Sequence, residues 1–309
     1  MRFFSKRPYI LFILPAFIFY TALVVYPIFS SFAVSLTRWN GMNEQIFVGF
    51  DNYIQLFTTT ELYSQLQNAI MNNVTMILFG VFITLPLQII VAYLIYNKVF
   101  AHNYSQVMTF STQLISTPII LIMTTLMLDS NVGLINHIIE NTLGRQYVRQ
   151  WAMMPELGIF PVWLMMTFSG FGIGMLFLVG AMRMISNEMI EAAKIDGAGY
   201  WSILLKIILP QIRVTIFNLI IITYIIMMTA FEFNFVFGGG TGSGGINNIY
   251  DTQALFFFRV AFGNLGQVGG TISANSMGMG TTIATVLFAM TFILSALQIV
   301  FVYGKKMED

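Results

Sequence analysis

The polar segment from residue 191 to residue 210 combines residue types at a spacing suited to a chemical role. A carboxylate and two small residues precede an acidic residue and a glycine, and an apolar run then ends in proline. No nucleophile lies beside a base, so this set is suited to docking against another surface and not to bond making. Its members are Glu191, Ala192, Ala193, Asp196, Gly197, Ile207, Leu209 and Pro210.

The same segment predicts a short helix–turn–helix. Strong helix formers run from Glu191 to Ile195, and Ser186 begins a stretch able to cap that helix. Gly197 predicts its end, because glycine adopts the left-handed conformation of a helix C-terminus at little cost. An apolar helix should restart over Tyr200–Leu209. Two interpretations stay open: a lever pressed into a partner, or an amphipathic interfacial helix with nothing docked on it.

Other catalytic and metal-binding chemistry finds no support in the sequence. There is no cysteine, and the two histidines, His102 and His137, lie in different expected loops. No Gly-x4-Gly-Lys-Ser/Thr motif occurs, so the chain has no phosphate-binding loop of its own. We predict a chain that catalyses no reaction, and binds no metal and no cofactor.

Composition predicts an all-α, multi-pass membrane protein. Of the 309 residues, 57% are hydrophobic and 9% charged, whereas soluble domains average about 25% charged residues. Mean hydropathy is +0.78. A helix needs roughly 20 apolar residues to cross the hydrocarbon. Six runs meet that length: about 9–31, 70–96, 106–128, 157–181, 214–237 and 280–303.

The distribution of basic residues predicts the orientation. With the N-terminus inside, 10 of the 14 lysines and arginines fall on the cytoplasmic side, as the positive-inside rule requires. Both termini and the loop 182–213 are then cytoplasmic. The first apolar run is too long for a signal peptide and is expected to stay as a helix. The net charge of +1 excludes a bulk binder of polyanions.

A few polar residues fall inside the expected spans. Glu232 is the one acidic residue placed there, which suggests a functional group by default; a wet carboxylate near the interface is the alternative. Asn72, Asn73 and Gln88 are expected to hydrogen-bond across helices, most readily to a second subunit.

The segment 191–210 fits the pattern Glu-Ala-Ala-x3-Gly-x9-Ile-x-Leu-Pro at every fixed position. It resembles the cytoplasmic coupling loop of permease subunits in ATP-driven, binding-protein-dependent importers. Further marks resemble the carbohydrate, maltose-transporter-like branch, although Thr241 and Val214 stand where that branch usually has proline. These marks are Trp39-Asn-Gly41, Val48-Gly-x-Asp51-Asn-Tyr53, Phe231–Gly242, Ala261-Phe262 and Ser273-Ala274.

The resemblance implies a type I ABC importer permease fold, with residues 1–309 as one permease domain in a bacterial-type cell membrane. It implies inward movement of a sugar or oligosaccharide by alternating access. The expected partners are a sister permease forming a heterodimer, two ATPase subunits that bind ATP and Mg²⁺, and an extracytoplasmic binding protein. Substrate-pathway candidates on the fourth and fifth spans are Thr167, Ser169, Gly170, Tyr224, Met227, Phe231, Glu232 and Asn234.

Two alternatives remain at this point. The same machinery could carry another polar solute such as glycerol-3-phosphate, although no lysine or arginine lies within a span to bind a phosphate. An ATP-independent secondary transporter should have ion-coupling carboxylates in several spans, and only Glu232 qualifies.

Overall fold

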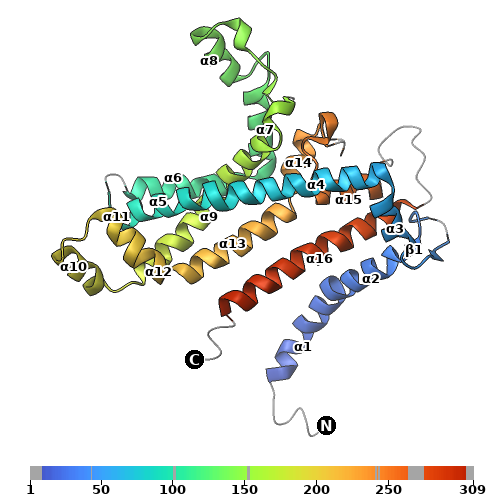
Figure 1. The fold of residues 1–309 in the computed structure, drawn as a ribbon, viewed down its shortest axis with the longest axis horizontal. Coiled ribbons are helices and arrows are strands. Elements are labelled where there is room, and N and C mark those ends of the chain that lie inside the picture. The colour runs from blue at the N-terminus through green and yellow to red at the C-terminus, as the bar shows by residue number, and fades with distance from the viewer. Residues whose placement is uncertain are drawn as a thin grey trace. The chain divides into compact units, whose positions relative to one another are not determined.

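The computed structural model describes residues 9–42, 44–99, 102–151, 154–240, 242, 244–263 and 275–303 (Figure 1). These residues are almost entirely helical, which confirms the all-α prediction. Thr241, Ser273 and Ala274 lie outside them. So do five of the ten basic residues counted for the cytoplasmic side: Arg2, Lys6, Arg7, Lys305 and Lys306.

The chain divides into two compact units, which are described separately; the prediction of one domain over 1–309 stays a prediction. Unit 1 comprises residues 1–64 and 257–289. It contains the last part of α15, which is Gln253–Phe262 as a whole, and the first part of α16, Ser276–Tyr303. Its other elements are α1 (Tyr9–Tyr20), η2 (Thr21–Val25), α2 (Tyr26–Ser35), β1 (Thr37–Arg38), β2 (Ile46–Phe47), α3 (Asp51–Thr58) and the start of α4 (Thr60–Phe79).

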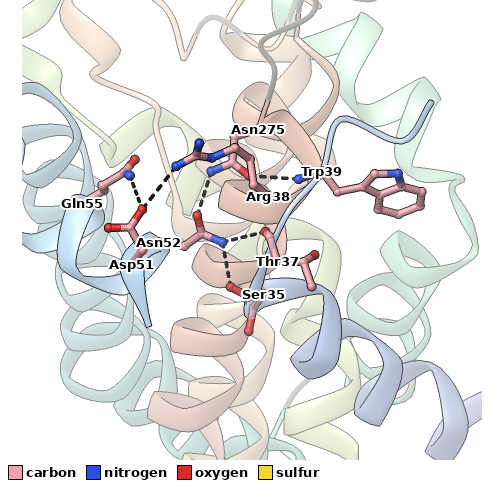
Figure 2. A network of polar contacts seen from close by, with 8 residues as sticks. All are labelled: Ser35, Thr37, Arg38, Trp39, Asp51, Asn52, Gln55 and Asn275. Atoms are coloured by element: carbon pink, nitrogen blue, oxygen red, sulfur yellow. Dashed lines mark hydrogen bonds and ion pairs between the residues drawn. The ribbon is translucent and has the colours of Figure 1, made fainter. Parts of the chain in front are cut away.

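A buried asparagine organises unit 1 (Figure 2). The Asn52 amide donates hydrogen bonds of 2.8 Å to the carbonyls of Ser35 and Thr37, and its oxygen accepts one of 2.7 Å from the Asn275 amide. Asn275 in turn accepts the backbone N–H of Trp39 at 3.2 Å. These bonds satisfy carbonyls left open where α2 ends. The Trp39 side chain points away from the network.

The short hairpin and an ion pair complete this network. The strands β1 and β2 are antiparallel, with Thr37 opposite Phe47 and Arg38 opposite Ile46. Arg38 lies 3.5 Å from the carboxylate of Asp51, and both side chains are about half exposed, at 49% and 43%. The contacts that join α2, α3 and α16 therefore explain the residue types found between Val48 and Tyr53.

Unit 2 comprises residues 65–256 and 290–309. Its central element is α9 (Phe160–Arg183), which contacts α5, α6, α7, α13 and α14. Figure 1 shows α5 and α9 reaching the end of the unit from which α10, α11 and α12 extend. The elements of this unit, besides the rest of α4, α15 and α16, are η3 (Gly80–Thr84), α5 (Leu85–Tyr96), α6 (His102–Ser111), η4 (Thr112–Leu114), α7 (Thr117–Leu128), α8 (Leu134–Thr142), η5 (Arg145–Tyr147), η7 (Pro155–Leu157), α9, α10 (Asn187–Ile195), α11 (Tyr200–Ile203), η8 (Leu204–Ile208), α12 (Leu209–Gln211), α13 (Arg213–Met228), α14 (Glu232–Phe237) and η9 (Ile246–Asn248).

Small residues let the helices of unit 2 approach closely, as in other membrane bundles. A side chain at Gly172 would meet the backbone of Thr109 at 2.5 Å. One at Gly80 would meet the side chain of Thr223 at 2.6 Å. These contacts bring α9 against α6, and η3 against α13.

Five helical runs among the described residues are long and apolar enough to cross a membrane, and a bent pair supplies a sixth if it is counted as one span. The five runs are Phe12–Ser35, Thr60–Tyr96, Phe160–Arg183, Arg213–Phe237 and Ser276–Val300. The second begins ten residues earlier than predicted, because its first turns carry Glu61 and other polar residues that lower local hydropathy.

The span predicted over 106–128 contains a sharp bend, and it is one span only if the bent pair is counted as one. Two helices, Tyr104–Leu114 and Thr117–Leu128, meet there at 98°. Ile115 and Ser116 between them have extended backbone. Pro118 is the cause: it has no N–H, and its ring would clash with the carbonyl of Leu114, four residues earlier. Pro118 thus lies in the first turn of α7 as a helix-start proline.

Three other prolines follow π-helical turns. The turns η2, η3 and η8 each end two residues before a proline, namely Pro27, Pro86 and Pro210. In each, the residue preceding the proline donates its N–H to the carbonyl five residues back. The wider turn lets the helix continue through a residue that would otherwise break it.

Candidate coupling site and transport pathway

The polar insert, by which we mean the loop 182–213, contains a helix that ends in a defined turn. The helix α10 is followed by Gly197, whose φ is +79°. Gly197 donates to the carbonyl of Lys194 at 3.1 Å, and Ala198 donates to Ala193 at 2.9 Å. This pair of bonds is a Schellman motif, so the predicted glycine stop is confirmed. Ser186 holds the expected N-cap position, although its side chain makes no capping hydrogen bond.

The second half of the insert restarts as predicted and then widens. The helix α11 begins at Tyr200, passes into the π turn η8, and ends in α12, which contains Pro210. Leu209 donates to the carbonyl of Leu204 across that turn. The chain re-enters the bundle at Arg213, the first residue of α13.

A shared hydrophobic core joins the insert to the spans. Ile190 of α10 and Ile203, Leu204 and Ile208 of the second half are at most 6% exposed. They pack with buried residues of α5, α9 and α13: Leu85, Ala92, Tyr93, Ile95, Met175, Leu178, Val179, Met182 and Leu219. Fully burying one such side chain contributes about 1.5–3 kcal/mol. The insert therefore shares one hydrophobic core with these helices.

A tyrosine pair fixes the start of the second half. Tyr93 of α5 is 1% exposed and donates its hydroxyl to the Tyr200 carbonyl at 2.8 Å. The two rings lie 4.4 Å apart between centroids. Burial raises the pKa of the Tyr200 phenol above its ordinary value, so it stays neutral at physiological pH. Sequence reasoning did not single out Tyr93, whose role depends on a partner 107 residues away.

The predicted coupling residues divide into an exposed and a half-buried group. Ala193, Ile207 and Leu209 pack against the shared core. Glu191, Ala192, Asp196, Gly197 and Pro210 are exposed. The insert also exposes Met184, at 88%, and Ile195, at 86%. These two exposed apolar residues were not predicted from the sequence. The signal that could have found them is their position, which is out of phase with the buried apolar residues of the insert. Together the exposed residues form the face available to a partner.

The fifth span is interrupted at the point where pathway residues were predicted. The helix α13 ends at Met228 and α14 begins at Glu232. Glu232 is exposed, and Phe231 stacks on Phe235 at 5.4 Å. Discontinuous membrane helices are typical of transporter binding sites, because they free backbone polar groups.

Buried amides and hydroxyls satisfy that break. Asn73 donates to the carbonyl of Met227 at 2.7 Å and accepts the N–H of Gln253 at 3.0 Å. Thr252 donates to the carbonyl of Ala230 at 2.7 Å. Asn72 donates to the carbonyl of Asp251 at 2.8 Å. Asn73 and Thr252 thereby bond carbonyls at the open end of α13 and in the break that follows it, whereas Asn72 bonds the segment that precedes α15.

The expectation that Asn72, Asn73 and Gln88 bond to a second subunit is therefore corrected. All three amides donate within this chain, Gln88 to the carbonyl of Phe171 at 3.1 Å. The carbonyls they reach belong to the end of α13, to α9 and to the segment before α15. A hydropathy pattern does not show that these segments lie beside the three amides.

The remaining pathway candidates do not converge on one described cavity. Tyr224 donates to the carbonyl of Met290 at 2.9 Å, Met227 is buried in the core, and the amide of buried Asn234 donates to the Tyr250 carbonyl at 2.8 Å. Thr167 shares a 3.0 Å bond with Thr84 and lines a cavity of about 420 Å³. Ser169 is half-buried and Gly170 exposed.

The fold defines a class: a polytopic membrane protein whose helical bundle carries a helix–turn–helix insert at one end. The family of binding-protein-dependent transport system inner membrane components matches residues 59–309, and the chain belongs to that family. It is thus a multi-pass protein of the cell membrane.

Similar proteins agree with this assignment. A probable ABC transporter permease of Bacillus subtilis, YurN, is 28% identical over 97% of each chain. A probable permease for starch degradation products, AmyD of Thermoanaerobacterium thermosulfurigenes, is 23% identical over 97% of this chain and 95% of that protein.

Solved structures share the fold. A chain of a bacterial alginate ABC transporter, crystallised with an alginate pentasaccharide-bound periplasmic protein, matches with a TM-score of 0.70. The match covers 98% of this chain and 96% of that one, at 19% identity.

Proposed function

We propose that this chain is a non-catalytic, membrane-spanning subunit of an ATP-driven importer, and that the cargo is a sugar or oligosaccharide. The observation that carries the proposal is the shared core between the insert and the inner ends of α5, α9 and α13. A force on α10 reaches those helices without an intervening flexible joint. The exposed residues from Glu191 to Pro210 provide the surface on which the force would act.

The mechanism is alternating access. An extracytoplasmic binding protein delivers the substrate to the outer end of the bundle. Closure of an ATPase dimer on the insert turns the cavity outward, and hydrolysis resets it. ATP and Mg²⁺ are bound by the ATPase, because this sequence has no phosphate-binding loop. The chain itself holds no catalytic group.

The assembly needs more than one permease chain. At most six spans among the described residues make half of a pathway, so a sister permease in a heterodimer and two ATPase subunits are the proposed partners.

Three observations support a sugar as cargo. The relative AmyD and the alginate transporter carry saccharides according to their descriptions. Near the break in the fifth span, Glu232 offers a hydrogen-bond acceptor beside the stacked Phe231 and Phe235. Aromatic rings and carboxylates suit the apolar faces and hydroxyls of a pyranose. No lysine or arginine lies between the ends of the described spans to bind a phosphate.

Reconstitution tests the proposal. The chain, its sister permease, the ATPase and the binding protein are co-expressed and placed in proteoliposomes with ATP inside the lumen or omitted. ATP-dependent uptake of a radiolabelled mono- or oligosaccharide is expected. Uptake that persists without ATP would point to a secondary transporter and refute the coupling role. ATP-dependent uptake of glycerol-3-phosphate, with no saccharide transported, would retain the machinery and refute the cargo.

A further inference from the structure

The inner face of α10 encloses a cavity with the ends of two spans. Its volume is about 460 Å³. The end of α5 contributes Tyr96 and Lys98, and the end of α9 contributes Arg183. Along α10, Asn187, Glu191 and Lys194 line it, at the spacing that places residues on one face of a helix. All of these residues belong to unit 2.

The cavity has an excess of positive charge. Three cations, Lys98, Arg183 and Lys194, face it together with one carboxylate, Glu191. Among the described residues, none of these four groups makes an ion pair within 4.0 Å. Tyr96 and Asn187 add a hydroxyl and an amide able to donate hydrogen bonds. The set is suited to an anion with several acceptor oxygens.

The backbone of Lys98 is an independent sign that this side chain has a role. Its φ is +54°, in the left-handed region that favours glycine. Lys98 donates to the carbonyl of Ile95 at 3.0 Å and Val99 donates to Leu94 at 3.2 Å, the arrangement in which helices usually end with glycine. A lysine kept in a strained position suggests a function for its ammonium group.

The position of the cavity identifies the anion. It lies where α5 and α9 end, on the side that the distribution of basic residues places in the cytoplasm. Lipid headgroups are expected at the ends of spans, the inner leaflet is anionic, and basic pockets beside membrane helices bind acidic headgroups. Tyr96 fits the same level, where aromatic side chains gather.

We propose that this cavity binds the phosphate-bearing headgroup of an anionic phospholipid of the inner leaflet, such as phosphatidylglycerol. Lys98 and Arg183 hold the phosphate from the span ends, and Lys194 holds it from α10. The bound lipid then connects the coupling insert to the membrane surface as well as to the helices. The proposed lipid site requires that this end of the bundle face the cytoplasm, but it does not require that the chain take part in transport.

Native mass spectrometry of the full-length chain, released from nanodiscs of phosphatidylcholine and phosphatidylglycerol, tests the proposal. The double variant Lys98→Gln/Arg183→Gln should bind phosphatidylglycerol roughly 25-fold more weakly, at about fivefold for each basic side chain. The control Lys206→Gln/Arg213→Gln removes two exposed cations of the same region that do not line the cavity. It should bind within about twofold of the parent.

A second variant separates binding from folding. Lys98→Gly removes the ammonium and also relieves the left-handed strain, so it should raise the melting temperature while weakening phosphatidylglycerol binding. Equal binding by parent and double variant would overturn the proposal. So would displacement of the lipid by millimolar inorganic phosphate or by the docked ATPase, since the cavity would then serve a free anion or the partner. Lipid binding is measured without transport, so failure of uptake leaves this result intact.

Discussion

The hydroxyl of Tyr93, near the inner end of α5, donates a 2.8 Å hydrogen bond to the main-chain carbonyl of Tyr200, the first residue of α11. A 1%-exposed side chain of a span thus holds the turn between the two helices of the insert. The contact lies between the surface proposed to meet the ATPase and a helix proposed to move.

Replacing Tyr93 with phenylalanine should weaken coupling while keeping the ring contact. The lost hydrogen bond is worth about 1 kcal/mol, and the Tyr200 carbonyl keeps only the backbone N–H of Leu204 as a donor. We expect substrate imported per ATP hydrolysed to fall about fivefold, with ATP hydrolysis in the absence of substrate retained. Tyr104→Phe, at a tyrosine 77% exposed, is the control. An unchanged transport-to-hydrolysis ratio in Tyr93→Phe would remove this contact from the coupling route.

Gly197→Val should disrupt the turn of the insert. At φ +79°, a β-branched residue costs about 1–2 kcal/mol, and the Schellman hydrogen bonds to Lys194 and Ala193 should loosen. Hydrolysis uncoupled from transport is expected in the reconstituted system, with the melting temperature changed by only a few degrees. Gly199→Val is the matched control, since Gly199 has φ −71° and open space around its Cα. If ATP hydrolysis is equally coupled to transport in the two variants, the proposed role of this turn in coupling is refuted.

The Asn52–Asn275 pair should show energetic coupling in unit 1. Asn52→Ala removes two hydrogen bonds to carbonyls and leaves the Asn275 amide without its acceptor, at a cost of about 1–3 kcal/mol. Asn275→Ala should cost less, and the double variant should cost clearly less than the sum. Thermal unfolding in detergent measures all three. Gln55→Ala, which loses only a half-buried bond to Asp51, is the control. Strictly additive losses would contradict the pairing.

Glu232→Gln tests the pathway assignment. Glu232 is exposed at the first turn of α14, so its loss should leave folding intact. Removal of the charge should raise the KM for substrate by several-fold while ATPase docking is retained. Glu188→Gln, also exposed and in the first turn of its helix, is the control. If the KM and the maximal rate are unaltered, Glu232 is a solvated carboxylate near the membrane interface and does not contact the substrate.

Asp129 should make its outer loop sensitive to acid. Its carboxylate accepts the backbone N–H groups of Asn131 at 2.8 Å and Val132 at 3.1 Å, which lowers its pKa below the ordinary value. Because the folded pKa is the lower one, this contribution is present above the unfolded pKa near 4 and is lost as pH falls through the folded value. The protection factors of the amides of residues 131–132, which compare each exchange rate with the intrinsic rate at the same pH, should fall on acidification in the parent but not in Asp129→Asn. Identical pH profiles would contradict this.

Local chemistry was predictable from the sequence where a single residue type determines it. Gly197 ends α10 because a left-handed residue is needed there, and the core side of the restarted helix follows from its apolar spacing. The docking insert could therefore be outlined before any coordinates. Whether its residues contact an ATPase stays a prediction.

Partners created by tertiary structure were not predictable. Asn73 can bind carbonyls at the end of α13 only because that helix ends at Met228. The run of isoleucines and methionines in α13 contains no sequence signal for that end. The 98° angle between α6 and α7 also depends on how the two helices pack on α9, which the sequence does not show. The pathway candidates also lack the sister permease that would complete a cavity around them.

The π turns before Pro27, Pro86 and Pro210 have a consequence for reading and altering this chain. Each adds about one residue relative to a regular α-helix, which shifts every later side chain by about 100° around the helix axis. Heptad-like patterns on the two sides of such a turn are therefore out of phase. Deleting one residue from Gly80–Thr84 should convert this turn into a regular α-helical one and leave α5, with Tyr93, facing its present partners. The same deletion within the regular helix Thr60–Phe79 should instead rotate α5 away from them.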